Sequence, residues 1–219
     1  MIVRSEVDMR RLAKALALCS TLPLVAGCIS YNQHTTFESD GSGRIVLDTW
    51  VRYFGDEEGD QTAGENVTPE ASDELDPAFA GLKGVTVEEN WAKVEGEGDD
   101  RREHTHIVLG FDKVERFSGH GVFKNQELTF QKDGNEFLFK QVILNEREEE
   151  PEESTKESEE LARTLFEGYT FTYTVVMPGR VVDTTGTVGD DGRTVTWEWP
   201  LYDFANLEEV IMTAASLKE

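Results

Sequence analysis

The chain has 219 residues, of which 38% are hydrophobic and 10% aromatic, enough to bury the core of one globular domain. It carries 44 Asp and Glu residues against 21 Lys and Arg residues, a formal net charge of −23 at pH 7. Such a surface repels phosphate backbones and anionic lipid headgroups, so the composition excludes a nucleic-acid-binding protein.

The amino-terminal segment has the pattern of an export signal. Basic residues gather within 10–14, and the apolar stretch 15–24 follows them. That stretch is well short of the roughly 20 residues of a membrane-spanning helix. We therefore predict a signal peptide rather than a transmembrane anchor.

Ala26 and Gly27 are small residues directly before Cys28, as in a bacterial lipobox. We predict that the signal, residues 1–27, is removed and that Cys28 receives a diacylglyceryl group and further acyl chains such as palmitate. Two or three chains anchor a protein firmly in a membrane. Position 29 is Ile rather than Asp, which favours the outer membrane if the cell is Gram-negative.

The mature chain, residues 28–219, is predicted to be a single domain built mainly from strands, because apolar residues recur at every second position. A Gly-rich turn at 40–43 joins the first two strands into a hairpin that begins close to the membrane anchor. The predicted strands are 31–38, 44–54, 85–95, 104–112, 128–131, 136–144, 169–177, 180–187 and 194–199. An antiparallel meander is the natural arrangement of these strands.

Short helices are predicted beside the strands. A helix start at 68–70 precedes an apolar stripe that ends at Gly84, and Ser158 caps a second helix that Gly168 closes. The last segment, 201–217, fits either a helix or a strand, and we favour a helical turn followed by a strand. The predicted fold class is α+β, a mainly antiparallel β-sheet with two short helices packed on it.

Acidic residues concentrate in three segments. The Glu-rich run 145–160 is predicted to be a solvated loop. Asp56-Glu57-Glu58-Gly59-Asp60 and Asp190-Asp191-Gly192 offer oxygen ligands, but neither has the spacing of an EF-hand calcium loop. We expect weak cation association there and no cofactor.

Three segments carry a resemblance to a known family. They are Cys28 followed by the hairpin around Asp40-Gly41-Ser42-Gly43, the region 85–123 with its Gly110-Phe111-Asp112, and the ending 171–182 followed by 194–201. Over most of residues 28–216 the chain resembles the predicted bacterial lipoproteins of the LppM type. The resemblance implies a compact α+β domain and the binding of a lipid or glycolipid, and it brings no catalytic residue.

Two histidines have a spacing that is also found in zinc sites. His104 and His106 lie two apart on a predicted strand and therefore share a face, and His34 or His120 is a possible third ligand. No cysteine or carboxylate motif accompanies them. We predict an exposed strand face that binds no metal.

Aromatic residues have two interpretations. Tyr169, Phe171 and Tyr173 share one predicted strand face, and Trp197 and Trp199 share another. They either pack as core against the helices, or they line an apolar cavity for an acyl chain between a curved sheet and a helix. The possible apolar pocket consists of Trp50, Trp91, Phe171, Tyr173, Trp197 and Trp199.

No Gly-x-Ser-x-Gly elbow, phosphate-binding loop or His-Glu-x-x-His motif occurs in the sequence, so we predict no enzyme. The predicted function is that of a noncatalytic, membrane-anchored bacterial envelope lipoprotein that binds a lipid-like or protein partner near the membrane. The alternative is a structural or assembly factor that docks a basic envelope partner through its acidic surface. Binding to a basic partner would weaken steeply with salt, whereas apolar binding would not.

Overall fold

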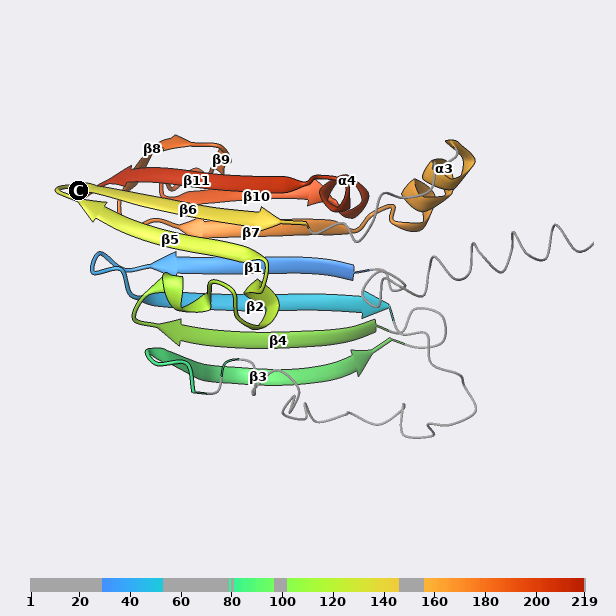
Figure 1. The fold of residues 1–219 in the computed structure, drawn as a ribbon, viewed down its shortest axis with the longest axis horizontal. Helices are drawn as coiled ribbons and strands as arrows, with labels where there is room; N and C mark the ends of the chain where they lie inside the picture. Colours follow the sequence, from blue (N-terminus) through green and yellow to red (C-terminus); the bar gives the residue numbers. More distant parts are fainter. Residues whose placement is uncertain (1–28, 53–78, 80, 97–101, 146–155, 219) are drawn as a thin grey trace, which may run out of the picture.

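Two β-sheets packed face to face form the body of the protein in the computed structural model (Figure 1). The structure describes residues 29–52, 79, 81–96, 102–145 and 156–218. The predicted signal, the helix start at 68–70 and the acidic segment 56–60 therefore lie outside the described residues.

The larger sheet has seven strands in the order β3-β4-β2-β1-β7-β10-β9. Their bounds are β1 (Ile29–Phe37), β2 (Gly43–Arg52), β3 (Val85–Glu95), β4 (Arg102–Phe111), β7 (Thr170–Val176), β9 (Thr187–Val188) and β10 (Thr194–Pro200). Strand β1 runs antiparallel to β2 but parallel to β7, so the sheet is mixed.

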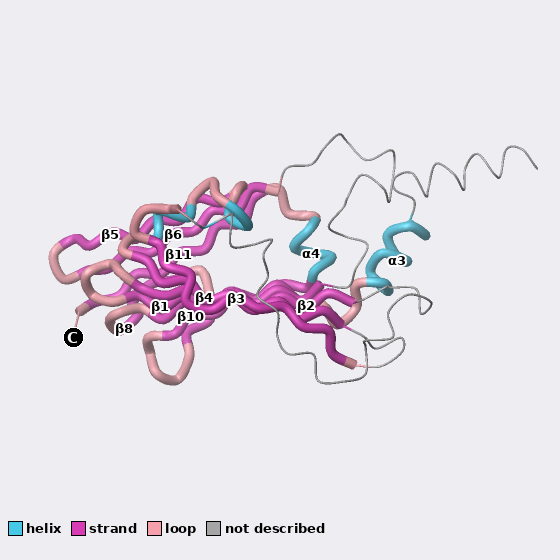
Figure 2. Tube along the Cα trace, turned by 90° about the horizontal axis from the view of Figure 1, so that it is seen from below, coloured by secondary structure: helices cyan, strands magenta, loops and turns pink. Residues whose placement is uncertain are grey.

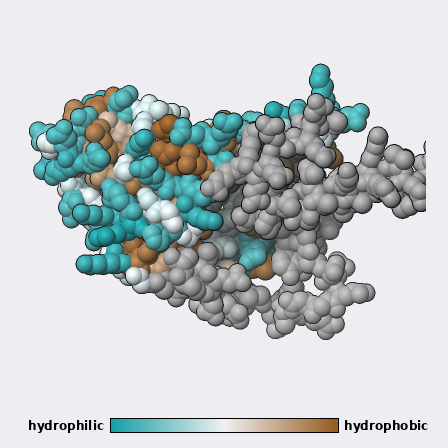
Figure 3. Space-filling view, in the orientation of Figure 1, coloured by the Kyte–Doolittle hydropathy of each residue, from teal (hydrophilic) through white to brown (hydrophobic). Residues whose placement is uncertain are grey.

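The smaller sheet has four antiparallel strands in the order β5-β6-β11-β8. Their bounds are β5 (Gln126–Asp133), β6 (Glu136–Leu144), β8 (Arg180–Thr184) and β11 (Glu209–Leu217). The face seen in Figure 3 is largely hydrophilic, with smaller apolar groups between the polar side chains. Figure 2 shows that the smaller sheet covers only one end of the larger one.

Helices are few in the part of the chain that the structure describes. The elements with described bounds are α3 (Lys156–Leu165), α4 (Leu201–Ala205) and the short 3-10 helices η2 (Val114–Phe117) and η3 (Gly121–Phe123). Helix α4 lies over the end of the larger sheet that the smaller sheet leaves uncovered (Figure 2). Helix α3, by contrast, is largely exposed, with Leu161 at 60% exposure, so of α3 and α4 only α4 packs firmly on a sheet. Within the described ranges, no helix is long and apolar enough to cross a membrane.

The β-rich α+β fold is confirmed, but three details of the prediction are wrong. The strands form two sheets instead of one meander, because β1 is enclosed between β2 and the distant β7. The larger sheet, predicted to be mainly antiparallel, is mixed, because β1 and β7 are parallel. The predicted loop 145–160 is helical from Lys156 onward, and Ser158 lies inside that helix instead of capping it.

Alternation along the strands builds the core. On β1, Gln33, Thr35 and Phe37 are buried and point toward the smaller sheet, whereas His34 between them is exposed. The ring of Phe37 stacks on Phe130 of β5 with centroids 4.3 Å apart. The face of the larger sheet that carries Phe37 is called the inner face below, and the face that carries His34 the outer face.

A polar chain crosses this core between the sheets. The side-chain amide of Gln33 donates hydrogen bonds to Thr35 and to Gln141 of β6, each at 3.2 Å, and the amide of Gln141 donates to Gln126 at 2.6 Å. The hydroxyl of Tyr31 donates to Gln33 at 3.2 Å. Because Gln33 is 2% exposed and Gln141 is fully buried, these groups depend on one another for hydrogen bonds.

Candidate functional site

The six residues predicted to line one pocket lie on opposite faces of the larger sheet. Phe171, Tyr173, Trp197 and Trp199 are on the inner face, whereas Trp50 and Trp91 are on the outer face. The prediction of a single six-residue pocket is therefore wrong. The cause is strand alternation: Trp50 stands three positions after the inward-facing Leu47 and points the other way.

An inner aromatic cluster occupies the end of the larger sheet under α4. It consists of Tyr31, Phe171, Tyr173, Trp199 and Phe204. Phe204 of α4 stacks on Phe171 with centroids 4.2 Å apart and an interplanar angle of 15°. Tyr173 is 2% exposed, while Tyr31, Phe171 and Trp199 are only partly buried.

Burial affects both tyrosines of the inner aromatic cluster. It raises the pKa of Tyr31, and it also raises the pKa of Tyr173, with a smaller contribution from the neighbouring Tyr31. Both hydroxyls therefore stay protonated at physiological pH. The cluster is an uncharged aromatic surface with phenolic hydroxyl groups among its rings.

Trp197 belongs to the core between the sheets rather than to this cluster. Its indole N–H donates a hydrogen bond to the Thr185 hydroxyl at 3.0 Å, and its ring lies 6.3 Å from that of Phe139 on β6. With 5% of its surface exposed, it is a structural residue. Of the six predicted pocket residues, three therefore contribute to the inner aromatic cluster.

The position of the inner aromatic cluster follows from the strand register. Tyr31 pairs with Phe171, and Phe171 pairs with Trp199, so these residues lie side by side across β1, β7 and β10. Strand β1 begins at Ile29, directly after Cys28 in the sequence. The aromatic cluster thus lies at the end of the domain where the predicted anchor enters the fold.

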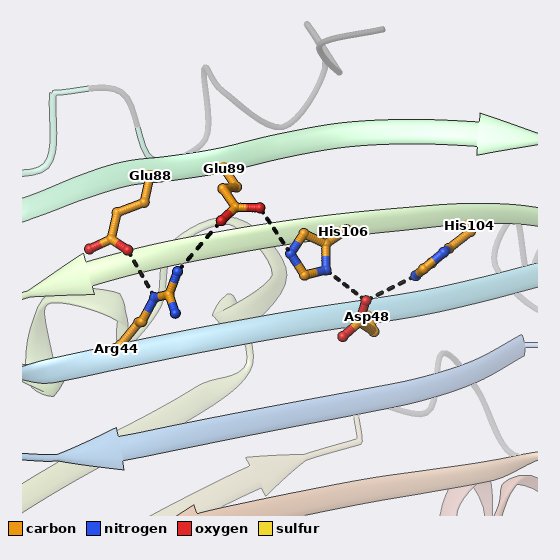
Figure 4. A network of polar contacts seen from close by, with 6 residues as sticks. All are labelled: Arg44, Asp48, Glu88, Glu89, His104 and His106. Atoms are coloured by element: carbon orange, nitrogen blue, oxygen red, sulfur yellow. Dashed lines mark hydrogen bonds and ion pairs between the residues drawn. The ribbon is translucent and has the colours of Figure 1, made fainter. Parts of the chain in front are cut away.

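A second group of side chains gathers on the outer face, as Figure 4 shows. Asp48 of β2 meets both histidines of β4: its Oδ1 lies 2.9 Å from Nε2 of His104 and 2.8 Å from Nδ1 of His106. All three side chains are partly buried, at 32%, 12% and 18% exposure respectively. We call Asp48, His104 and His106 the histidine–aspartate cluster.

Tryptophans hold both rings of this cluster. Trp50 stacks on His104 with centroids 3.7 Å apart and an interplanar angle of 15°. Trp91 stacks on His106 at 4.8 Å and meets the edge of His104 at 4.9 Å. The two tryptophans predicted for an apolar pocket therefore flank two imidazoles instead.

His34 and His120, the two residues considered as a possible third metal ligand, do not lie beside His104 and His106. His34 is exposed on β1, and His120 lies in the loop before η3, where its Nδ1 contacts the Ser118 carbonyl at 2.9 Å. The third group is Asp48, which sequence analysis missed. It pairs with His106 only through the register of β2 with β4, and spacing along the chain carries no signal of that register.

The acidic segment Asp190-Asp191-Gly192 is a turn. The Asp191 carboxylate accepts hydrogen bonds from the N–H groups of Arg193 and Thr194 and from the Thr194 hydroxyl. These internal donors hold the Asp191 carboxylate within the turn. The segment therefore has a structural role.

Comparison with family profiles identifies one family. The profile of the LppM domain matches residues 56–211, well over half of the chain. The NMR structure of the folded domain of LppM from Mycobacterium tuberculosis is similar, with 11% sequence identity, a TM-score of 0.45, and coverage of 87% of this chain and 90% of that chain. No curated protein matches. The extent of the profile match establishes that the chain belongs to the LppM domain family.

Proposed function

We propose that the protein is a noncatalytic lipoprotein, anchored to a bacterial envelope membrane through Cys28, that binds a lipid-like ligand at its inner aromatic cluster. Membership of the LppM family supports a lipoprotein-like protein of the cell envelope. The single observation that carries the ligand proposal is the partly buried aromatic surface beside the first strand.

The short connection to the anchor supports a ligand drawn from the membrane. Tyr31 stands three positions after Cys28, so at about 3.3 Å per residue it lies within roughly 10 Å of the acylated residue. An acyl chain leaving the bilayer at this point would meet Tyr31 and Phe171 first. Apolar chains bind to such surfaces by removing aromatic and aliphatic area from water.

Helix α4 provides the movable side of the proposed site. It has only five residues, and Phe204 is the ring that closes it over Phe171. A small outward shift of this helix would expose the inner aromatic cluster, and it would break the hydrogen bond that the Asn145 side-chain amide donates to the Phe204 carbonyl at 3.0 Å. The ligand would then pack between α4 and β7.

Quenching by a brominated fatty acid tests the ligand proposal. Two variants of the mature chain retain a single tryptophan each, Trp199 in the first and Trp50 in the second, with the other tryptophans changed to Phe. We expect saturable quenching of Trp199 and none of Trp50, because only Trp199 lies in the inner aromatic cluster. Equal quenching of both, or none of either, contradicts the proposal.

Fractionation of cells tests the anchor separately. The Cys28→Ala variant should leave the membrane pellet and appear in the soluble fraction, because it cannot carry the acyl chains. The His34→Ala variant, changed on an exposed strand face, should pellet like the wild type. A Cys28→Ala protein that still pellets at its mature mass contradicts lipid anchoring.

The alternative function, an assembly factor that docks a basic envelope partner, predicts binding that depends strongly on salt, whereas lipid binding at an apolar surface does not. Its binding would rest on the net charge of −23 and would fall steeply as ionic strength rises. Fatty-acid quenching repeated at low and high NaCl should change little if the inner aromatic cluster is the site.

A further inference from the structure

We propose that the histidine–aspartate cluster binds a divalent transition-metal ion such as Zn²⁺, because one ring nitrogen of His104 and one of His106 converge on the same carboxylate oxygen of Asp48 on the outer face. The three donor atoms lie within 4.8 Å of one another. This site is on the opposite face from the inner aromatic cluster and does not depend on the lipid-binding proposal.

The donor geometry is close to that of a bound ion. Zinc lies about 2.0–2.2 Å from histidine nitrogens and carboxylate oxygens, so two ligands of a tetrahedral site are roughly 3.4 Å apart. Asp48 Oδ1 is now 2.9 Å from Nε2 of His104 and 2.8 Å from Nδ1 of His106. Entry of an ion therefore requires the Asp48 oxygen to move away from each ring nitrogen by only about half an ångström.

The ion would replace the protons that the three groups now share. Each hydrogen bond to Asp48 requires a proton on the facing ring nitrogen. On metal binding that proton moves to the other nitrogen of the same ring, or to solvent if the ring was charged. In the metal-bound form the ligands are one carboxylate and two neutral imidazoles.

Glu89 is placed to support His106 in the metal-bound form. Its carboxylate lies 3.6 Å from Nε2 of His106, the nitrogen that does not face Asp48. Histidine ligands commonly donate this second N–H to a carboxylate, which fixes the ring and strengthens the ligand. Arg44 in turn pairs with Glu89 at 3.6 Å and with Glu88 at 2.8 Å, and so holds both carboxylates in position (Figure 4).

A β-bulge explains why two glutamates reach this face. The register of β3 with β4 shifts between Val87, which pairs with Leu109, and Glu89, which pairs with Val108, so Glu88 is an extra residue between them. In an unbroken strand one of them would point to the inner face. The irregularity thus brings Glu89 to His106 while Glu88 holds Arg44.

The two histidines are not equivalent ligands. His106 has Glu89 behind it, whereas Nδ1 of His104 is buried without a hydrogen-bond partner among the described residues. The stacked ring of Trp50 orients His104 instead. We therefore expect His106 to contribute more to affinity than His104.

The ligand set selects the class of ion. Two imidazoles and one carboxylate favour Zn²⁺, Co²⁺, Ni²⁺ and Cu²⁺ over Ca²⁺ and Mg²⁺, which prefer sites made of oxygen atoms. Three protein ligands also leave one coordination position for water or for a ligand from outside. The site would therefore have three protein ligands and one open position, as zinc sites that bind water or a substrate do.

Metal titration of the untagged mature chain tests the site. After treatment with a chelator, the protein should bind one Co²⁺ with the visible absorption of a nitrogen- and oxygen-coordinated ion, and Zn²⁺ should displace it. Cu²⁺ should quench tryptophan emission in the same stoichiometry, since Trp50 and Trp91 stack on the ligand rings. Ca²⁺ should not compete.

Variants distinguish metal binding at the histidine–aspartate cluster from metal binding by carboxylates elsewhere on the acidic surface. His106→Ala should lower Zn²⁺ affinity more than 100-fold, and Glu89→Gln by about 10- to 100-fold, as is usual for a carboxylate behind a ligand. Glu89 is 52% exposed, so its variant should fold even if His106→Ala does not. His34→Ala, on the same face but outside the cluster, should bind like the wild type.

Three results would overturn the proposal. One is the absence of saturable Zn²⁺ or Co²⁺ binding to the wild type. Another is equal affinity in the wild type and a folded His104→Ala/His106→Ala double variant, which would assign the ion to surface carboxylates. The third is full competition by Ca²⁺.

Discussion

At the scale of single residues, Asp191 fixes the turn that leads into β10. Its oxygens accept hydrogen bonds from the Thr194 hydroxyl at 2.6 Å and from the N–H groups of Thr194 and Arg193 at 2.9 and 3.0 Å. These bonds, the Thr194 hydroxyl first, lower the pKa of Asp191 to about 2 because they favour the ionised carboxylate.

The lowered pKa gives a pH-dependent contribution to stability. Because the pKa is lower in the folded protein than its ordinary value of 3.8, the stabilisation is complete above that value and is lost as the pH falls toward 2. Urea denaturation should show the wild type more stable than Asp191→Asn at pH 7, with a difference that shrinks between pH 4 and pH 2. The exposed neighbour Asp190, changed to Asn, should have little effect. A difference that does not vary with pH would contradict a role for the charge.

Gln33 and Gln141 give a second prediction at this scale. Gln141→Leu should cost about 1–3 kcal/mol of unfolding free energy, because it removes the acceptor of one of the hydrogen bonds that the buried Gln33 amide donates. The double change to Leu should cost less than the sum of the two single changes, since both unpaired groups are then removed. A double-mutant cycle by urea denaturation measures the coupling, and strictly additive losses would contradict it.

At the scale of elements, Phe204 fastens α4 to the larger sheet. It is 6% exposed and stacks on Phe171, whereas the neighbouring Tyr202 is less buried and packs against the Arg163 guanidinium at 4.4 Å. Phe204→Ala should therefore cost about 3–5 kcal/mol of unfolding free energy. Tyr202→Ala should cost clearly less in the same denaturation experiment. Equal losses would mean that α4 is not held through its inner ring.

Local alternation predicts strands but not their partners. The predicted strands 85–95 and 136–144 have the observed bounds. Side chains alternate between buried and exposed from Phe137 to Gln141, whereas the β-bulge between Val87 and Glu89 interrupts the alternation of the other strand. No local pattern places β1 beside β7, and Asp48 stands opposite His106 only after β2 and β4 have paired. The same limit explains the division of the six-residue pocket. Face assignments across distant strands depend on register, and register is a property of the assembled sheet.

At the scale of the whole molecule, excess negative charge opposes folding. With a net charge of −23, the carboxylates repel one another more strongly in the compact state than in the extended one. The distance over which this repulsion acts falls from about 30 Å at 0.01 M salt to about 8 Å at 0.15 M. The unfolding temperature should therefore rise over this range, equally with NaCl and KCl. A constant or falling temperature would contradict net repulsion.

The parallel pairing of β1 with β7 has a consequence for how the chain acquires its structure. The chain is synthesised from its amino end, so β1 and β2 can form their hairpin before β7 (Thr170–Val176) has been made. During that interval one side of β1 is an open edge, able to join strands of other molecules. Since pairing over such a long sequence separation is slow, newly made copies should depend on a holding chaperone until their last third has arrived.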